Sequence, residues 1–163
     1  MGLGLPCPRP IEKAKDWVEN RAADAGAIIR HGINPQNPTN IFNQILGASI
    51  AALSSCDREQ KEGGIVVYRN CGGLSGFISN KLFRGQTFTV GSFILSPGPL
   101  EGDLLKHELA HVEQYDVLGG GFLPIYTLLA GMTSAACQGD TVCTHGSHPL
   151  EFLADKRAGT DIR

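Results

Sequence analysis

The segment His107-Glu108-Leu109-Ala110-His111 places two imidazoles and a carboxylate at a spacing that can do chemistry. Residues four apart on an α-helix lie one turn apart on the same face, so His107 and His111 can direct ring nitrogens at one metal ion. Glu108 is rotated by about 100° from His107, within reach of a water on that ion without being a ligand. The spacing predicts a zinc site with Glu108 as the general base. The alternative is an ordinary helix that carries two hydrogen-bonded histidines.

A catalytic zinc needs a third protein ligand and an open position for water. The metzincin pattern would require glycine at 114 and histidine at 117, where the sequence has Gln114 and Val117. Further along, Glu151 and Asp155 stand four apart in a segment with helical character. We expect Glu151 to be the third ligand and Asp155 to accept a hydrogen bond from a ligand histidine. The rival third ligands are His145 and His148.

Two helices are expected before the motif, over residues 11–32 and 41–56, because apolar residues recur there at helical spacing. Trp17 lies on the apolar side of the first and is expected in the core. The composition then changes. Residues 57–64 resemble a polar turn, and the stretch after them, up to residue 96, is rich in β-formers and interrupted by glycine.

In that stretch we expect a strand over 65–70, a turn at 71–73, and one or two strands over 81–96. Asp103 is expected to cap the helix that carries the motif, which ends at the glycine run 119–121. Further helices are predicted over 124–136 and 149–159, with a loop between them.

This order of elements predicts a single α+β domain over residues 1–163, mostly helical, with a small antiparallel-type sheet before the H-E-x-x-H helix. Residues 1–10 are expected to be a flexible lead, and the start of the chain lacks the pattern of a secretory signal, as in a domain cut from a longer protein. The net charge is −2 without a basic stripe, which gives no support for nucleic-acid binding. We expect no membrane span, because no apolar run has the required length.

Five cysteines leave at least one unpaired within the chain. Cys137 and Cys143 are close enough in sequence for a small disulfide. Two interpretations stay open: free buried thiols in a reducing compartment, or an oxidising destination such as a periplasm.

The motif residues together resemble a known group of enzymes. H-E-L-A-H followed by E-x-x-A-D at 151–155 is similar to the gluzincin metallopeptidases, the thermolysin-like group. A closer likeness is to the C-terminal metallopeptidase domains of bacterial polymorphic toxins, including Rhs-type proteins and the spike proteins of type VI secretion systems. That likeness is carried by residues 86–96, 104–126 and 148–159, roughly the C-terminal half of the chain.

The resemblance implies a zinc-dependent metallopeptidase that acts as a secreted antibacterial or host-directed effector. It implies a protein or peptide substrate, a carrier such as a secretion spike or Rhs-type protein, and an immunity protein. The destination would be a target cell, with its periplasm as one option. Residues 86–96 would supply an edge strand that pairs with an extended substrate.

The tetrahedral oxyanion formed during peptide hydrolysis needs a donor besides the metal. His148 is the expected catalytic donor, because it lies shortly before Glu151. The other candidates are His145, Tyr115, Tyr126 and Arg157. Two other functions stay open: a non-catalytic zinc-binding adaptor module of a secretion particle, and a zinc hydrolase that acts on cell-wall peptide.

Overall fold

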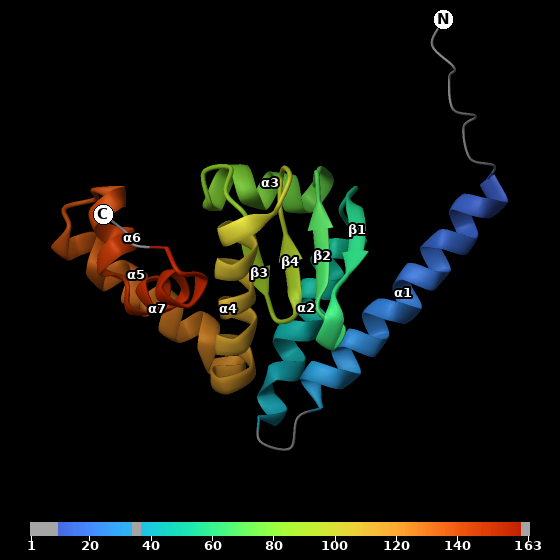
Figure 1. Cartoon of the computed structure of the whole chain (residues 1–163), viewed down its shortest axis with the longest axis horizontal. Helices are drawn as coiled ribbons and strands as arrows, with labels where there is room; N and C mark the ends of the chain where they lie inside the picture. Colours follow the sequence, from blue (N-terminus) through green and yellow to red (C-terminus); the bar gives the residue numbers. More distant parts are fainter. Residues whose placement is uncertain (1–9, 34–36, 161–163) are drawn as a thin grey trace, which may run out of the picture.

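The computed structural model describes residues 10–33 and 37–160 (Figure 1). In chain order the elements are α1 (Pro10–Gly32), η1 (Pro38–Asn40), α2 (Ile41–Ala52), β1 (Asp57–Gln60), η2 (Glu62–Gly64), β2 (Val66–Arg69), α3 (Gly73–Leu82), β3 (Phe88–Val90), β4 (Phe93–Leu95), α4 (Gly102–Leu118), η3 (Gly119–Gly121), α5 (Phe122–Ala136), α6 (Thr141–Ser147) and α7 (Pro149–Ala158). Helices dominate and a small sheet precedes the motif helix α4, so the predicted α+β class is confirmed. The expected flexible lead, apart from Pro10, lies outside the described residues.

The four strands form one sheet in the order β1-β2-β4-β3. β1 and β2 are antiparallel, as are β3 and β4, but β2 and β4 run parallel. The sheet is therefore mixed rather than purely antiparallel. The parallel pair is accommodated because α3 and β3 lie between β2 and β4 in the chain and provide the crossover that parallel strands need. β3 lies at an edge of the sheet.

The two faces of the sheet support different helices, because successive strand residues point to opposite sides. One face, which includes Val66 and Phe93, packs into a core with residues of α1, α2 and α3. The other face carries Val67 and Ile94 and packs on α4 through Val112. Thr89 stands opposite Ile94 in the strand register and therefore faces α4 as well. α4 thus covers the face that α1 and α2 leave free.

The C-terminal helices lie on the other side of α4. Figure 1 shows α5, α6 and α7 gathered on one flank of α4, with the sheet on the opposite flank. Tyr115 of α4, Phe122 of α5 and Leu150 of α7 form the buried centre of this packing. The motif helix is consequently held from both sides, which fixes its rotation about its own axis.

Three elements were missed from the sequence, the first being β1. The polar stretch expected to be a turn forms β1 at the outer edge of the sheet, where one side of the strand can stay polar. Arg58 of β1 reaches the buried carboxylate of Asp24 on α1, with its Nε 3.1 Å from Oδ1. A buried ion pair therefore takes the place of the apolar alternation that usually marks a strand.

The other two missed elements are helices, α3 and α6. α3 is rich in glycine and serine, which are weak helix formers, yet Ser75, Gly76 and Ser79 are buried in it, and their small size lets it lie close to its neighbours. α6 begins in the stretch expected to be a loop, where the Asp140 side chain accepts a hydrogen bond from the Cys143 N–H at 2.7 Å.

Trp17 was expected in the core, but it is 60% exposed. The buried side chains of α1 lie further along the helix, at Asp24 and Ala27, where the helix meets the sheet. Figure 1 shows the start of α1 extending beyond the rest of the fold. The apolar side chains of α1 therefore begin earlier in the helix than its contact with the sheet and α2, and Trp17, near the start, stays exposed.

One helical stretch, Gly102–Ala136, comprises α4, η3 and α5, and it is long and apolar enough to cross a membrane by length and composition. Its most apolar window is 11% buried, so this window is mainly surface rather than core. Length and composition are weak evidence for a span, and the first half of the stretch packs between the sheet and α7. The absence of a membrane span stays a prediction.

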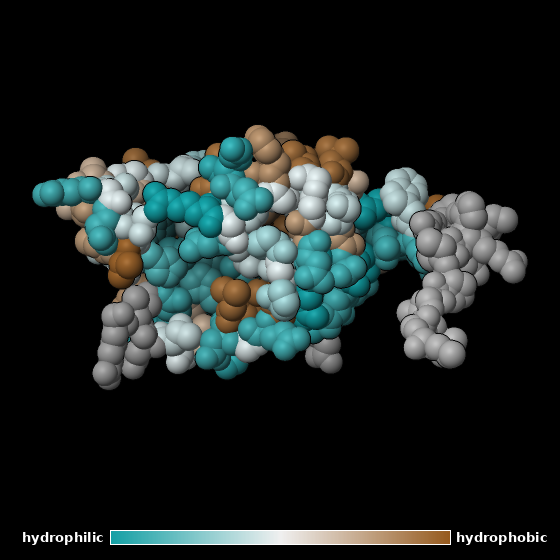
Figure 2. All heavy atoms as spheres, turned by 90° about the horizontal axis from the view of Figure 1, so that it is seen from above, coloured by the Kyte–Doolittle hydropathy of each residue, from teal (hydrophilic) through white to brown (hydrophobic). Residues whose placement is uncertain are grey.

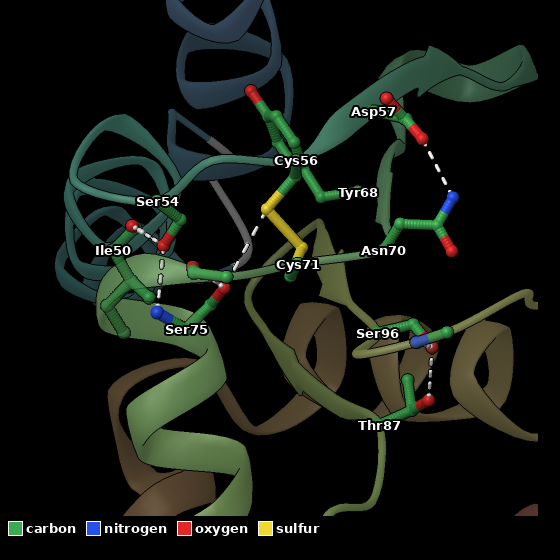
Figure 3. The surroundings of a disulfide bond; sticks show 12 residues. Ile50, Ser54, Cys56, Asp57, Tyr68, Asn70, Cys71, Ser75, Thr87 and Ser96 are labelled. Atoms are coloured by element: carbon green, nitrogen blue, oxygen red, sulfur yellow. Dashed lines mark hydrogen bonds between the residues drawn. A yellow bond between two sulfur atoms is a disulfide. The ribbon is translucent and has the colours of Figure 1, made fainter.

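Two disulfides tie the chain. Cys56 pairs with Cys71, with Cα atoms 4.3 Å apart, and Cys137 pairs with Cys143, with Cα atoms 5.7 Å apart. The first bond joins the segment after α2 to the short segment between β2 and α3, and Figure 3 shows Ser75 beside it. The second joins the end of α5 to α6. Cys7 lies outside the described residues.

Removing the first disulfide should destabilise the fold measurably. Cys56 and Cys71 are 15 positions apart, and replacing both by serine frees a loop of that length in the unfolded chain, which lowers the free energy of unfolding by about 3 kcal/mol. Replacing Cys137 and Cys143, which are 6 positions apart, lowers it by about 2 kcal/mol. Urea unfolding of the oxidised proteins measures both. Superimposable curves for wild type and the first variant would contradict the expected role.

Candidate metal centre

Three side chains from two helices converge on one point. His107 and His111, one turn apart on α4, bring their Nε2 atoms within 3.0 Å of each other. The carboxylate of Glu151, in the first turn of α7, places Oε2 at 3.2 Å from His107 Nε2 and Oε1 at 3.3 Å from His111 Nε2. All three residues are buried, and their ligand atoms form a group that could hold a metal ion. The structure thus brings together the three predicted ligands.

The hydrogen bonds behind the imidazoles fix which nitrogens face the centre. His107 Nδ1 lies 2.7 Å from Asp155 Oδ1, and His111 Nδ1 lies 2.9 Å from Gln114 Oε1. Both partners are acceptors, so each Nδ1 carries a proton, and a ring that has lost its second proton turns an Nε2 lone pair inward. Two lone pairs facing each other at 3.0 Å repel unless a proton or a cation lies between them. The residues present therefore fit a bound metal ion.

The charges of the group are strongly coupled in the metal-free protein. Burial lowers the pKa of His107, but hydrogen bonding to Glu151 and the nearby carboxylates outweigh it and raise the pKa to about 9. The pKa of His111 is raised too, since the same bond to Glu151 outweighs burial. Burial raises the pKa of Glu151, but the hydrogen bonds from both imidazoles leave it well below its usual range. A metal ion that binds here must displace protons from the histidines.

Glu108 of α4 contacts the sheet and is not part of this group. Its Oε2 accepts a hydrogen bond from Thr89 Oγ1 at 2.5 Å, and its side chain is 4% exposed. Burial raises the pKa of this carboxyl group. Thr89 is itself fixed, because its carbonyl oxygen accepts a hydrogen bond from the Tyr115 hydroxyl at 3.1 Å. A buried carboxylate beside the metal group, and separate from it, is placed to accept a proton.

The group opens into a cleft of about 840 Å³. One wall is formed by β3 and the segments on either side of it, and the other by α5, α6 and α7; the ligand residues and Glu108 lie along its floor. Seen from above in Figure 2, hydrophilic atoms cover much of the region between the C-terminal helices on the left and the central body. β3 is an edge strand along this wall, and its Thr89 carbonyl oxygen is already hydrogen-bonded to the Tyr115 hydroxyl.

The structure does not bring His148, the expected catalytic donor, to this cleft. His148 is 2% exposed and caps the start of α7: its Nδ1 accepts a hydrogen bond from the Glu151 N–H at 3.3 Å. Its Nε2 lies 3.1 Å from the Tyr126 carbonyl oxygen and donates to it. Both ring nitrogens are therefore engaged in contacts that hold the start of α7.

Two of the other donor candidates do face the metal group. The Tyr126 hydroxyl donates to Glu151 Oε1 at 2.6 Å, and His145 lies on the rim with Nδ1 at 3.3 Å from Glu151 Oε2. Tyr115 is committed to Thr89, and Arg157 pairs with Glu113 at 3.1 Å on the surface. Neither His145 nor His148 belongs to the described metal-binding group, which leaves Glu151 as its third member.

Sequence reasoning missed two supporting residues. Gln114 stands three positions after His111, and helical spacing puts it on the same face, so this contact could have been found from the pattern. It also donates from Nε2 to the Leu150 carbonyl at 2.9 Å, which ties α4 to α7. The contact of Thr89 with Glu108 depends on strand register and has no local signal in the sequence.

Comparison of the chain with family models, curated proteins and solved structures gave no match. The likeness to gluzincins and to toxin-borne metallopeptidases therefore rests on the motif residues alone. The geometry of the site carries the functional argument from here.

The ligand set can be tested by metal content. Glu151→Ala should lose the metal, because two imidazoles alone hold an ion weakly, and Asp155→Asn should lower affinity about 10–100-fold by loosening His107. Each protein is offered Zn²⁺, freed of excess by dialysis, and analysed for zinc per chain. Glu113→Gln, a carboxylate change on the exposed side of α4, serves as the control. Full zinc content in Glu151→Ala would place the third ligand elsewhere.

Proposed function

We propose that this protein is a zinc-dependent metallopeptidase. One observation carries the proposal: two inward-facing imidazoles and a carboxylate converge at the floor of a cleft, with a further buried carboxylate beside them that is not part of the group. Three protein ligands with an adjacent base is the arrangement of catalytic rather than structural zinc sites. The edge strand along the cleft supports a peptide as the substrate.

Zinc is the metal that this donor set fits best. Tetrahedral zinc with bonds of about 2.0–2.1 Å holds its ligand atoms about 3.3 Å apart. The two Nε2 atoms lie 3.0 Å apart, and each faces one Glu151 oxygen, Oε2 at 3.2 Å from His107 and Oε1 at 3.3 Å from His111. Two histidines and one glutamate, all buried, form a ligand set known for catalytic zinc. A site for Mg²⁺ or Ca²⁺ would offer oxygen atoms instead.

A bound zinc ion would supply a water of lowered pKa and a Lewis acid for the substrate carbonyl. Glu108 accepts the proton of the attacking water and later delivers it to the leaving amine nitrogen. Burial raises the pKa of Glu108, which favours the protonated form that it takes between the two steps. The Thr89 hydroxyl holds the carboxylate in place meanwhile.

Tyr126 and His145 are the residues placed to stabilise the oxyanion. The Tyr126 hydroxyl is already hydrogen-bonded to Glu151, so its hydrogen points at the metal group. The side chain of His145 is 45% exposed, at the rim of the cleft, where an incoming substrate meets it. The backbone of the substrate pairs with the free edge of β3, which orients the carbonyl over the floor.

Two features weigh against the non-catalytic adaptor. A structural metal site does not need a general base. Burying the Glu108 carboxylate lowers the stability of the fold, and in an adaptor no function would compensate for that loss. A cleft of about 840 Å³ is likewise of no service to a purely structural metal. A hydrolase acting on cell-wall peptide uses the same chemistry and differs only in its substrate, so the substrate assay below includes it.

We further propose that the domain is delivered to a target cell by a carrier, a secretion spike or Rhs-type protein, as an antibacterial or host-directed effector opposed by an immunity protein. The motif resemblance supports this proposal. The two disulfides support an oxidising destination such as a periplasm, because such bonds persist outside reducing compartments.

The function can be tested with Glu108→Gln, which removes the base but keeps the shape of the side chain. We expect unchanged zinc content and a loss of hydrolysis of at least about 10²–10⁴-fold. Unfolded casein and purified cell-wall fragments are digested in parallel and products identified by mass spectrometry. Exported to the periplasm of a test bacterium, the wild type should arrest growth and Glu108→Gln should not.

Glu113→Gln is the matched control, since it removes a carboxylate from the solvent side of the same helix and should leave hydrolysis unchanged. Hydrolysis by Glu108→Gln at the wild-type rate would reject the mechanism. Zinc-loaded wild type that cleaves neither substrate would favour the adaptor.

Thr89 is predicted to be a positioning residue for the base. Thr89→Val keeps the branched shape within β3 but removes the hydroxyl that holds Glu108, so kcat should fall about tenfold with KM and zinc content unchanged. Thr89→Ser restores the hydroxyl and should recover most of the rate. A rate loss of equal size in both variants would indicate a role in strand packing only.

A further inference from the structure

The cleft continues past the metal group into a second cavity of about 510 Å³. The two cavities share Phe83, Gln86, Tyr126, His145 and Glu151, so they are adjoining parts of one groove. The second lies between the end of α3 on one side and α5 and α6 on the other. A substrate whose reacting bond lies over Glu151 therefore extends a neighbouring residue into this cavity.

The second cavity differs from the first in charge. The described residues that line the first include four carboxylates and neither lysine nor arginine: Asp103, Glu108, Glu151 and Asp155. The second adds Arg84, the one arginine or lysine among its described lining residues. Arg84 is exposed and makes no ion pair with another described residue. An uncommitted guanidinium thus stands beside the floor of an otherwise acidic groove.

The backbone conformation at Arg84 is one that arginine does not favour. Arg84 follows the end of α3 with a φ of 54°, in the left-handed region, while the Gly85 N–H closes the helix end by donating to the Ser79 carbonyl at 2.9 Å. Glycine or asparagine adopts this conformation at lower energy than arginine. A strained residue at a cleft is a pointer to function when a specific group comes with it.

We propose that Arg84 selects the substrate of the cleft by binding a carboxylate of the peptide in the second cavity. This rests on the proposed peptidase function. The planar guanidinium forms paired hydrogen bonds with a carboxylate, and Leu82, Phe83 and Val142 line the same cavity, where the rest of the residue that carries the carboxylate can pack. The carboxylate is either an Asp or Glu side chain next to the scissile bond or the free C-terminus of a short product-like segment.

Three zinc-binding probes separate these sources without relying on hydrolysis. Each is a hydroxamate attached to one residue: glutamate with an amidated C-terminus, glutamine with a free C-terminus, and glutamine with an amidated C-terminus. Calorimetry gives the affinity of each for the zinc-loaded protein. Wild type should bind one of the two carboxylate probes about tenfold more tightly than the neutral probe, and which one it prefers identifies the source.

Arg84→Gly is the decisive variant, because glycine suits the backbone there and the protein should fold at least as well as wild type. It should bind all three probes equally, and Arg84→Glu should prefer the neutral probe. Lys81→Gln is the control: it removes a positive charge one turn earlier on α3, outside both cavities, and should keep the wild-type preference.

Equal affinity of wild type for the three probes, or a preference that survives in Arg84→Gly, would overturn the proposal. Peptide hydrolysis is measured on the same preparations. A preference that depends on Arg84 in a protein that cleaves no peptide upholds the carboxylate subsite and rejects the peptidase. Peptide hydrolysis without any such preference upholds the peptidase and rejects the carboxylate subsite.

Discussion

The structure depends on one contact, the approach of the Nε2 atoms of two buried imidazoles to 3.0 Å. This arrangement holds only if each ring is fixed from behind, by Asp155 and Gln114, and if a carboxylate is present in front. These contacts fix the position of α7 along α4 and its rotation about its own axis. The start of α7 sets that position: His148 caps the helix, so Glu151 falls in its first turn, directly across from α4.

The opposite side of α4 is fixed by the sheet. Val67, Ile94 and Thr89 form a row across three strands on the face that meets α4, and Thr89 ends the row at the edge. The first two side chains provide apolar packing, whereas the third provides the hydroxyl that meets Glu108. The strand that holds Glu108 also lines the cleft, so the contacts between α4 and the sheet position Glu108, the candidate metal ligands and this edge of the sheet together.

The sequence predicted those parts of the site that are local. The pairs His107 with His111 and Glu151 with Asp155 are each four residues apart, and helical geometry alone puts each pair on one face. Which face each helix turns to the other depends on tertiary packing and has no local signal. The position of His148 before Glu151 suggested a catalytic donor, whereas the structure shows it buried, with both ring nitrogens hydrogen-bonded at the start of α7.

The sequence-based predictions of the fold that were wrong failed for the same reason. β1 is polar because a sheet edge and an ion pair to Asp24 remove the need for apolar alternation, and α3 is weak in helix formers because close packing needs its small residues. Trp17 follows the apolar period of α1 past the end of the surface that could bury it. In each case packing between elements overrides the local pattern, and packing is what a single sequence does not display.

Charge balance explains how such a site can exist before any metal arrives. Burying His107 among Glu151, Glu108 and Asp155 would be costly for the carboxylates alone, but with a pKa of about 9 the imidazole is protonated at neutral pH and compensates their charge. A metal ion that binds here would replace protons on ligands that the fold already holds together. Two of the three apolar clusters lie on the faces of the sheet, and the third, between α4, α5 and α7, lies beside His111 through Phe122. The described fold therefore has a source of stability in apolar packing that does not depend on a metal ion, unlike small zinc domains that unfold without metal.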